Sequence, residues 1–202
     1  MIFLHLVLWD KTIKIWKKNN NNLYELNQDL PKKNVNDSIC EININEILTL
    51  SFEQREICFY KFNNNKYNFL TSIQNIHISG FPSNFVKIND DFFLVGGENK
   101  IFFININNHN IHFIYEIDQN IFISKWVQSF CLLNDNSLIV GVECDLLCFK
   151  INNNNLVLIN YLENATLDSE DDWRVISSIT QNSKGEIITT SYNSNIKVWK
   201  KK

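Results

Sequence analysis

A strand-like pattern recurs five times along the 202 residues, and its period limits the fold more than any other feature of the chain. The copies end on an apolar residue, and these anchor residues are spaced 44, 44, 45 and 50 positions apart: Trp16, Tyr60, Ile104, Phe149 and Trp199. An aliphatic residue stands three positions before each anchor: Ile13, Ile57, Ile101, Leu146 and Ile196. The repeat covers nearly the whole chain, so we expect a single domain, 1–202, built from one structural unit.

Asparagine-rich tracts separate two apolar runs in each of the first four copies, at 19–22, 63–65, 107–108 and 152–155. Asparagine adopts left-handed backbone angles more readily than any residue except glycine, which suits it to the turn of a β-hairpin. A biased composition explains why asparagine is common, with 33 in the chain, but not why the tracts keep the phase of the repeat. Each tract is therefore predicted to be a hairpin turn.

Two more apolar segments precede the third anchor's strand, 84–88 and 92–96 ahead of 100–104, and the other copies are built in the same way. Each unit thus holds four short strands, called a to d, in about 45 residues, which is the size of one β-propeller blade. Ala and Met, which favour helices, occur only as Ala165 and Met1. We predict an all-β fold, a propeller of about five four-stranded antiparallel blades with the first and last incomplete.

Two of the copies resemble the repeat of the WD (tryptophan-aspartate) family, which carries an Asp-x-Thr-Ile-Lys-Val-Trp run from the turn between strands b and c. The matching runs are Asp10-Lys11-Thr12-Ile13-Lys14-Ile15-Trp16 and Asn193-Ser194-Asn195-Ile196-Lys197-Val198-Trp199. The middle three copies keep only the period and polarity, and both tryptophans are followed by Lys instead of the family's Asp. The resemblance implies a divergent WD-repeat β-propeller.

The same resemblance implies that a few residues hold blades together rather than bind a ligand. In the family a His, a strand Ser or Thr, the turn Asp and the Trp form a buried hydrogen-bonded group. The residues that correspond in this chain are Asp10, Thr12 and Trp16 in the first copy, Ser191, Asn193 and Trp199 in the last, and His77 near the place of the family's His.

The ends of the chain fall at different points of the repeat. It is expected to begin inside strand b, in 2–9, and to end after strand c, in 195–202. Propellers of the WD family commonly close by returning an N-terminal strand d to the last blade, and seven blades need roughly 300 residues. Two interpretations follow: the chain is the C-terminal part of a seven-bladed ring, or it closes as five blades with one irregular seam.

Charge and motifs argue against several functions. The formal net charge is −3 and only two of 19 basic residues are arginines, so we expect no nucleic-acid partner. The sequence holds no Gly-rich phosphate loop, His-Glu-x-x-His motif or Gly-x-Ser-x-Gly elbow, so we expect no enzyme activity, catalytic residue, cofactor or metal. His109 and His112 lie in an asparagine-tract hairpin, where a shared metal ion is not expected.

Several features favour a cytoplasmic, soluble protein without a transmembrane segment. The five cysteines lack paired spacing, which indicates reduced thiols, and the longest apolar run is too short to span a membrane. Glycosylation sequons at Asn36 and Asn164 are expected by chance in so asparagine-rich a chain.

The last interval between anchors is five or six residues longer than the others, and the extra length falls in an acidic segment between the fourth and fifth units. Insertions in repeat arrays lie in loops on one face, often the binding face. We expect a docking site for a basic peptide or protein in this loop, beside Glu98 and Glu143, with Trp126 as a further member: Asp168, Glu170, Asp171, Asp172, Trp173 and Trp126. The alternative is a solvated loop that only aids solubility.

The resemblance implies a non-catalytic protein-protein interaction scaffold that belongs to a multiprotein complex. Two alternatives stay open: a phosphoinositide-binding adaptor recruited to membranes, and a truncated propeller fragment without function. Phosphoinositide binding would call for paired arginines on one blade, whereas Arg55 and Arg174 fall in different repeats.

Overall fold

The structure, a computed structural model, describes residues 3–7, 12–30, 38–51, 55–74, 76, 85–97, 100–117, 126–152, 155–165, 175–192 and 195–200. All regular secondary structure in these ranges is β-strand, in five antiparallel sheets that follow one another along the chain. None of the described segments is a helix of the length and apolarity that a membrane crossing requires. The predicted all-β fold is confirmed.

The sheets are numbered in chain order, and in each of them the strands pair in the order of the sequence. Sheet 1 contains β1 (Phe3–Val7), β2 (Ile13–Lys18) and β3 (Tyr24–Asp29); sheet 2 contains β4 (Ser38–Asn43), β5 (Glu46–Ser51), β6 (Glu56–Asn63) and β7 (Lys66–Ile73). Sheet 3 contains β8 (Phe85–Lys87), β9 (Phe92–Gly97), β10 (Lys100–Asn107) and β11 (Asn110–Ile117). Sheet 4 contains β12 (Val127–Leu132), β13 (Ser137–Val142), β14 (Asp145–Asn152) and β15 (Asn155–Leu162), and sheet 5 contains β16 (Ile176–Gln181), β17 (Ile187–Ser191) and β18 (Ile196–Trp199).

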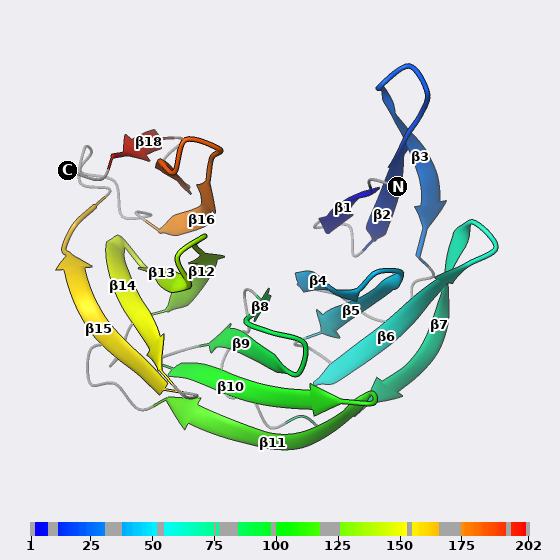
Figure 1. Cartoon of the computed structure of the whole chain (residues 1–202), viewed down its shortest axis with the longest axis horizontal. Helices are drawn as coiled ribbons and strands as arrows, with labels where there is room; N and C mark the ends of the chain where they lie inside the picture. The colour runs from blue at the N-terminus through cyan, green and yellow to red at the C-terminus, as the bar shows by residue number, and fades with distance from the viewer. Residues whose placement is uncertain are drawn as a thin grey trace.

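The five sheets stand around an open arc, with their later strands on the outside (Figure 1). Sheets 2, 3 and 4 have all four strands, whereas sheet 1 begins at strand b and sheet 5 ends at strand c, as the sequence predicts. Sheets 1 and 5 form the two arms of the arc and lie apart. The described residues therefore do not form the five-bladed closed ring that was one of the two interpretations. The reason is that no apolar cluster joins the two arms in the described part, while one joins each pair of successive sheets.

The anchor residues occupy one equivalent position in the third strand of every unit. Their cross-strand partners are Leu4, Ile47, Phe93, Leu138 and Ile187, all in strand b of the same sheet. The repeat seen in the sequence is thus a structural repeat. Alternating side chains of strand c then serve two different cores: Tyr60 packs toward sheet 1, and Phe59 packs toward sheet 3.

Burial on both faces explains why the inner strands are apolar throughout. Leu94 and Phe103 of sheet 3 pack against sheet 4, whereas their neighbours Val95 and Phe102 pack against sheet 2. Each of these side chains is at most 3% exposed. A strand covered on both sides reads as a continuous apolar run, without the alternation of a half-exposed strand.

The asparagine tracts form turns where the structure describes them. The backbone φ angle is positive at Asn22, Asn64, Asn65, Asn108 and His109, between strands c and d of sheets 1, 2 and 3. Asn19 adds a local contact, because its side-chain oxygen accepts bonds from the backbone N–H groups of Asn21 and Leu23, at 2.9 and 3.0 Å. The hairpin prediction is confirmed for these three tracts.

Candidate functional site

The acidic insertion leaves sheet 4 after Ala165 and returns at Val175, and both of its flanks are held at the β13–β14 turn. The Glu143 backbone has a φ of 51°, and its N–H donates to the Trp126 carbonyl at 3.0 Å. The Glu143 carbonyl accepts the N–H of Ile176 at 2.7 Å. This turn therefore connects the first strand of sheet 4 with the first strand of sheet 5.

Asp145, which is 2% exposed, holds the other flank of the insertion. Its Oδ1 accepts the backbone N–H of Asn164 at 2.8 Å, and its Oδ2 accepts the Tyr161 hydroxyl at 2.8 Å. The next carbonyl, that of Ala165, accepts a bond from Lys197 Nζ at 2.9 Å. The residues where the chain enters the insertion are therefore hydrogen-bonded to both sheet 4 and sheet 5.

The surroundings of this turn are acidic and partly apolar. Burial, together with the charge of Asp145, raises the pKa of the Cys144 thiol. Trp126, at the start of sheet 4, is 40% exposed. Asp168, Glu170, Asp171, Asp172 and Trp173 lie outside the described residues, as does Glu98. The Glu143 backbone thus links Trp126 to the C-terminal flank of the insertion, and Asp145 holds the N-terminal flank.

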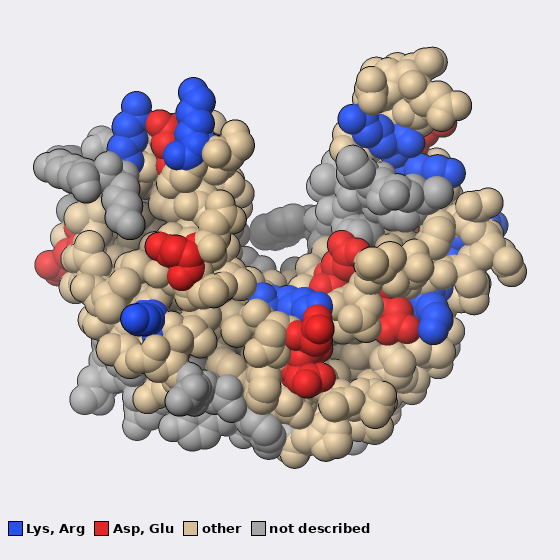
Figure 2. Space-filling view, in the orientation of Figure 1, with Lys and Arg blue, Asp and Glu red and all other residues tan. Residues whose placement is uncertain are grey.

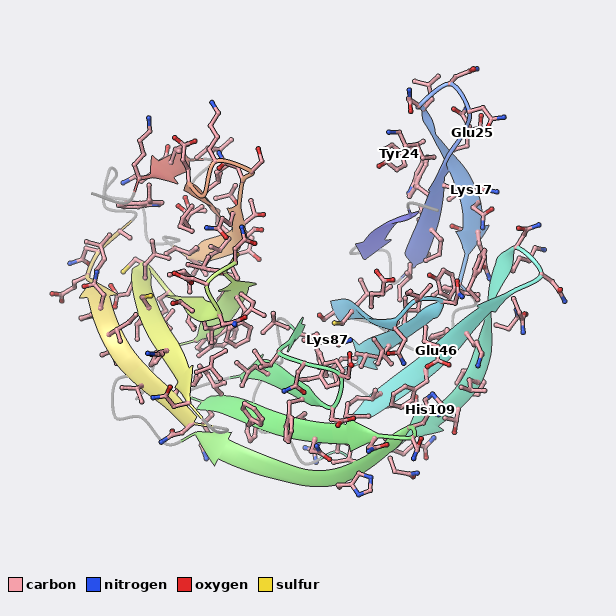
Figure 3. The ribbon with its side chains drawn as sticks, viewed as in Figure 1. Lys17, Tyr24, Glu25, Glu46, Lys87 and His109 are labelled. Atoms are coloured by element: carbon pink, nitrogen blue, oxygen red, sulfur yellow. The ribbon has the colours of Figure 1, made fainter. Side chains whose placement is uncertain are left out.

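A second polar cluster joins sheets 2 and 3 around a cavity of about 210 Å³ between their turns (Figure 3). Glu46 lies 3.2 Å from Lys61 Nζ and 3.5 Å from His109 Nε2, and Lys87 Nζ lies 2.8 Å from Asp90. Burial alone would raise the pKa of Glu46, but hydrogen bonds from Lys61 and Asn43 outweigh it and hold that pKa below its usual value. Among the described residues no group of three His, Cys, Asp or Glu side chains is placed to hold a metal ion.

Lys87 extends the link between the two sheets, because its Nζ also donates to the carbonyl of Ile42 in β4. His109 stacks edge-on against Phe59, with ring centroids 5.0 Å apart. The carboxylates of Glu46 and Asp90 are thus occupied by cations of the same chain. This arrangement ties sheets 2 and 3 together.

No protein-family model matches the sequence, and no curated protein matches it. Among solved structures, the chain is similar to the WD40 beta propeller domain of Doa1, with a TM-score of 0.69 and 18% sequence identity, over 99% of this chain and 61% of that chain. The fold is that of a WD40 β-propeller. The chain spans less than two thirds of the length of the Doa1 domain that it matches.

In this WD40 propeller fold, the hydroxyl that bonds the last tryptophan belongs to Thr189. Trp199 Nε1 donates to Thr189 Oγ1 at 3.0 Å, while Ser191 Oγ lies 3.5 Å from the carbonyl of Asn195. Sheet 2 repeats the arrangement, because Thr49 and the Tyr60 hydroxyl also share a hydrogen bond. Both threonines are at most 3% exposed.

The first tryptophan of the propeller has different surroundings. Trp16 Nε1 is buried and, within the described part of the chain, has no hydrogen-bond partner. The strand register places Leu6 at the position that threonine occupies in sheets 2 and 5, and leucine carries no hydroxyl. Thr12 is partly buried, and Asp10, His77 and Asn193 lie outside the described residues.

Sequence reasoning did not single out Thr49 and Thr189. They precede their anchors by 11 and 10 residues, and the corresponding Val95 and Val140 precede theirs by 9. The number of residues between this position and the anchor changes because the turns between strands b and c differ in length. Aligning the copies on their anchors without gaps therefore does not bring the two threonines and two valines into one column. The sequence does hold one signal: the strand b position carries threonine where the anchor is Tyr60 or Trp199, and valine where the anchor is Ile104 or Phe149.

Proposed function

We propose that the chain is a WD-repeat protein and a non-catalytic, cytoplasmic scaffold that binds a basic peptide or protein through the acidic insertion. The observation that carries the proposal is that the Glu143 backbone bonds both to Trp126, a partly exposed residue, and to Ile176 in the C-terminal flank of the insertion. An exposed indole supplies apolar contact area, and neighbouring carboxylates select a cationic partner. Membership of a multiprotein complex follows if the other blades bind further proteins.

The charge distribution supports this choice of partner. Between Glu163 and Asp172 the sequence has five acidic residues and no basic one. Glu143, which is partly exposed, adds another carboxylate at the turn that holds the insertion's C-terminal flank. On the face shown in Figure 2, basic side chains lie on both arms of the arc and also near its middle, where acidic side chains lie beside them. The excess of acidic residues in the insertion is expected to attract a basic partner to the sheet 4 to sheet 5 junction.

Affinity capture from cell extract, read by quantitative mass spectrometry, tests the proposal. The triple variant Asp171→Ala, Asp172→Ala, Trp173→Ala is expected to lose a partner that the unchanged chain retains. A matched variant, Glu41→Gln with Asp91→Asn, removes two exposed charges elsewhere and is expected to retain it. A lysine-rich competitor peptide should displace the same partner and a glutamate-rich peptide should not.

Two results would contradict the proposal. The first is an identical set of captured proteins for the unchanged chain and the insertion variant. The second is displacement by the glutamate-rich peptide as readily as by the lysine-rich one, because this would remove charge as the basis of selection.

A further inference from the structure

The outer strand of sheet 4, β15, is chemically unlike the other outermost strands. Its eight residues, Asn155–Leu162, include no charged side chain. Val157 is 44%, Ile159 55% and Leu162 42% exposed, so the strand presents apolar side chains to solvent along its length. β15 lies on the outside of the arc (Figure 1), and within the described residues the only strand that it pairs with is β14.

Edge strands are normally protected by charges, because an unpaired row of N–H and C=O groups invites pairing with another chain. The outermost strands of sheets 1, 2 and 3 each contain a charged residue: Glu25 and Asp29 in β3, Lys66 in β7 and Glu116 in β11. Exposure alone would not distinguish β15, since Leu70 in β7 is 44% exposed. The distinguishing feature is exposed apolar surface without any charge to oppose an approaching strand.

We propose that β15 pairs with β15 of a second copy of this chain, antiparallel about a two-fold axis, to form a dimer. An uncharged strand is complementary to itself, whereas a strand with a charge near its centre would oppose that charge to its own copy. In the antiparallel arrangement Glu163 of one copy lies beside the asparagine tract of the other, and the two Glu163 carboxylates lie at opposite ends.

The size of the contact sets the expected strength of the dimer. Two paired eight-residue strands bury an area at or below the low end of specific interfaces, about 1,200 Å² in total. The dimer is therefore expected to be weak and concentration dependent, with a dissociation constant on the order of 10–100 μM. An unrelated extended peptide that carries charges is expected to bind this edge more weakly than a second copy of β15 does, because β15 has no charged side chain to pair with them.

Sedimentation equilibrium over a concentration series tests the dimer. The mass of the unchanged chain should rise from 23.8 kDa toward twice that value. Ile159→Lys, which brings two ammonium groups close to the two-fold axis, should weaken association by about tenfold or more. Val157→Lys should act in the same direction at a second exposed position.

The chain offers a matched control in Leu70→Lys. Leu70 and Ile159 are both the extra residue where the register shifts between strands c and d. Leu70→Lys should leave dimerisation unchanged, and circular dichroism should show that all three variants fold. The proposal is overturned if the unchanged chain stays at 23.8 kDa throughout, if both β15 variants associate like it, or if Leu70→Lys abolishes association equally.

Discussion

At the scale of single residues, the sheets of this propeller differ most clearly in whether a threonine is hydrogen-bonded to the aromatic anchor. In sheets 2 and 5 a threonine of strand b shares a hydrogen bond with the anchor of strand c, and in sheets 3 and 4 two apolar residues take these places. A buried indole N–H without an acceptor costs free energy; Thr189 supplies the acceptor for Trp199, whereas Trp16 in sheet 1 has none among the described residues. The sequence indicates which residues are anchors, but the hydroxyl partners become visible only through strand pairing.

Thr189→Val should lower the free energy of unfolding by about 1–3 kcal/mol, because it keeps the side-chain shape and leaves the Trp199 N–H unsatisfied. Urea denaturation followed by circular dichroism measures the effect. Thr180→Val, at an exposed position of β16, is the control and should change stability by less than about 0.5 kcal/mol. An equal effect of the two substitutions would show that the hydrogen bond contributes nothing.

The low pKa of Glu46 predicts a dependence of stability on pH. A carboxyl group whose pKa is lower in the folded than in the unfolded state stabilises the fold above its unfolded pKa, about 4.3, and loses this contribution as the pH falls. Glu46→Gln should therefore destabilise the protein near pH 7 and have little effect near pH 3. Glu41→Gln, at an exposed position of β4, controls for the loss of one carboxylate. A Glu46→Gln effect that is the same at both pH values contradicts this account.

At the scale of elements, the asparagine turns are what the sequence predicts most directly. Turn chemistry is local, and a tract between two apolar runs is enough to place a hairpin. The register shifts between strands c and d are not predictable in this way, although three of the four fall directly before an anchor. Such a shift, or β-bulge, depends on how a strand bends against the neighbouring sheet, and no residue type in these strands indicates where it occurs.

Asn65→Gly should stabilise the protein by up to about 1 kcal/mol, because φ at Asn65 is 63° and glycine adopts such angles without steric cost. Asn110→Gly is the matched control: Asn110 opens β11 just after the equivalent turn, within a strand, and glycine there should destabilise by about 0.5–1 kcal/mol. Thermal denaturation of both variants gives the comparison. Stabilisation by both, or by neither, would be inconsistent with the turn geometry.

At the scale of the whole molecule, the repeat predicts the number and order of the sheets, while the shape of the arc comes from the structure. Successive sheets share apolar cores made by neighbouring copies of the repeat, so their order follows from the chain itself. Whether sheets 1 and 5 lie in contact or apart depends on surfaces that are distant in the sequence, and the repeat pattern does not predict which of the two occurs. The acidic insertion was likewise predictable as a departure from the period, whereas the Glu143 and Asp145 bonds that hold its flanks were not.

Hydrogen exchange measured by mass spectrometry tests the repeating five-sheet arrangement most directly. The third strands of sheets 2, 3 and 4 (β6, β10 and β14) should exchange slowly, in blocks that begin near Glu56, Lys100 and Asp145 and therefore repeat every 44 to 45 residues. The turns at Asn64–Asn65 and Asn108–His109 should exchange fast between these blocks. Uniformly fast exchange, or slow exchange in blocks without this period, would contradict the propeller described for this chain.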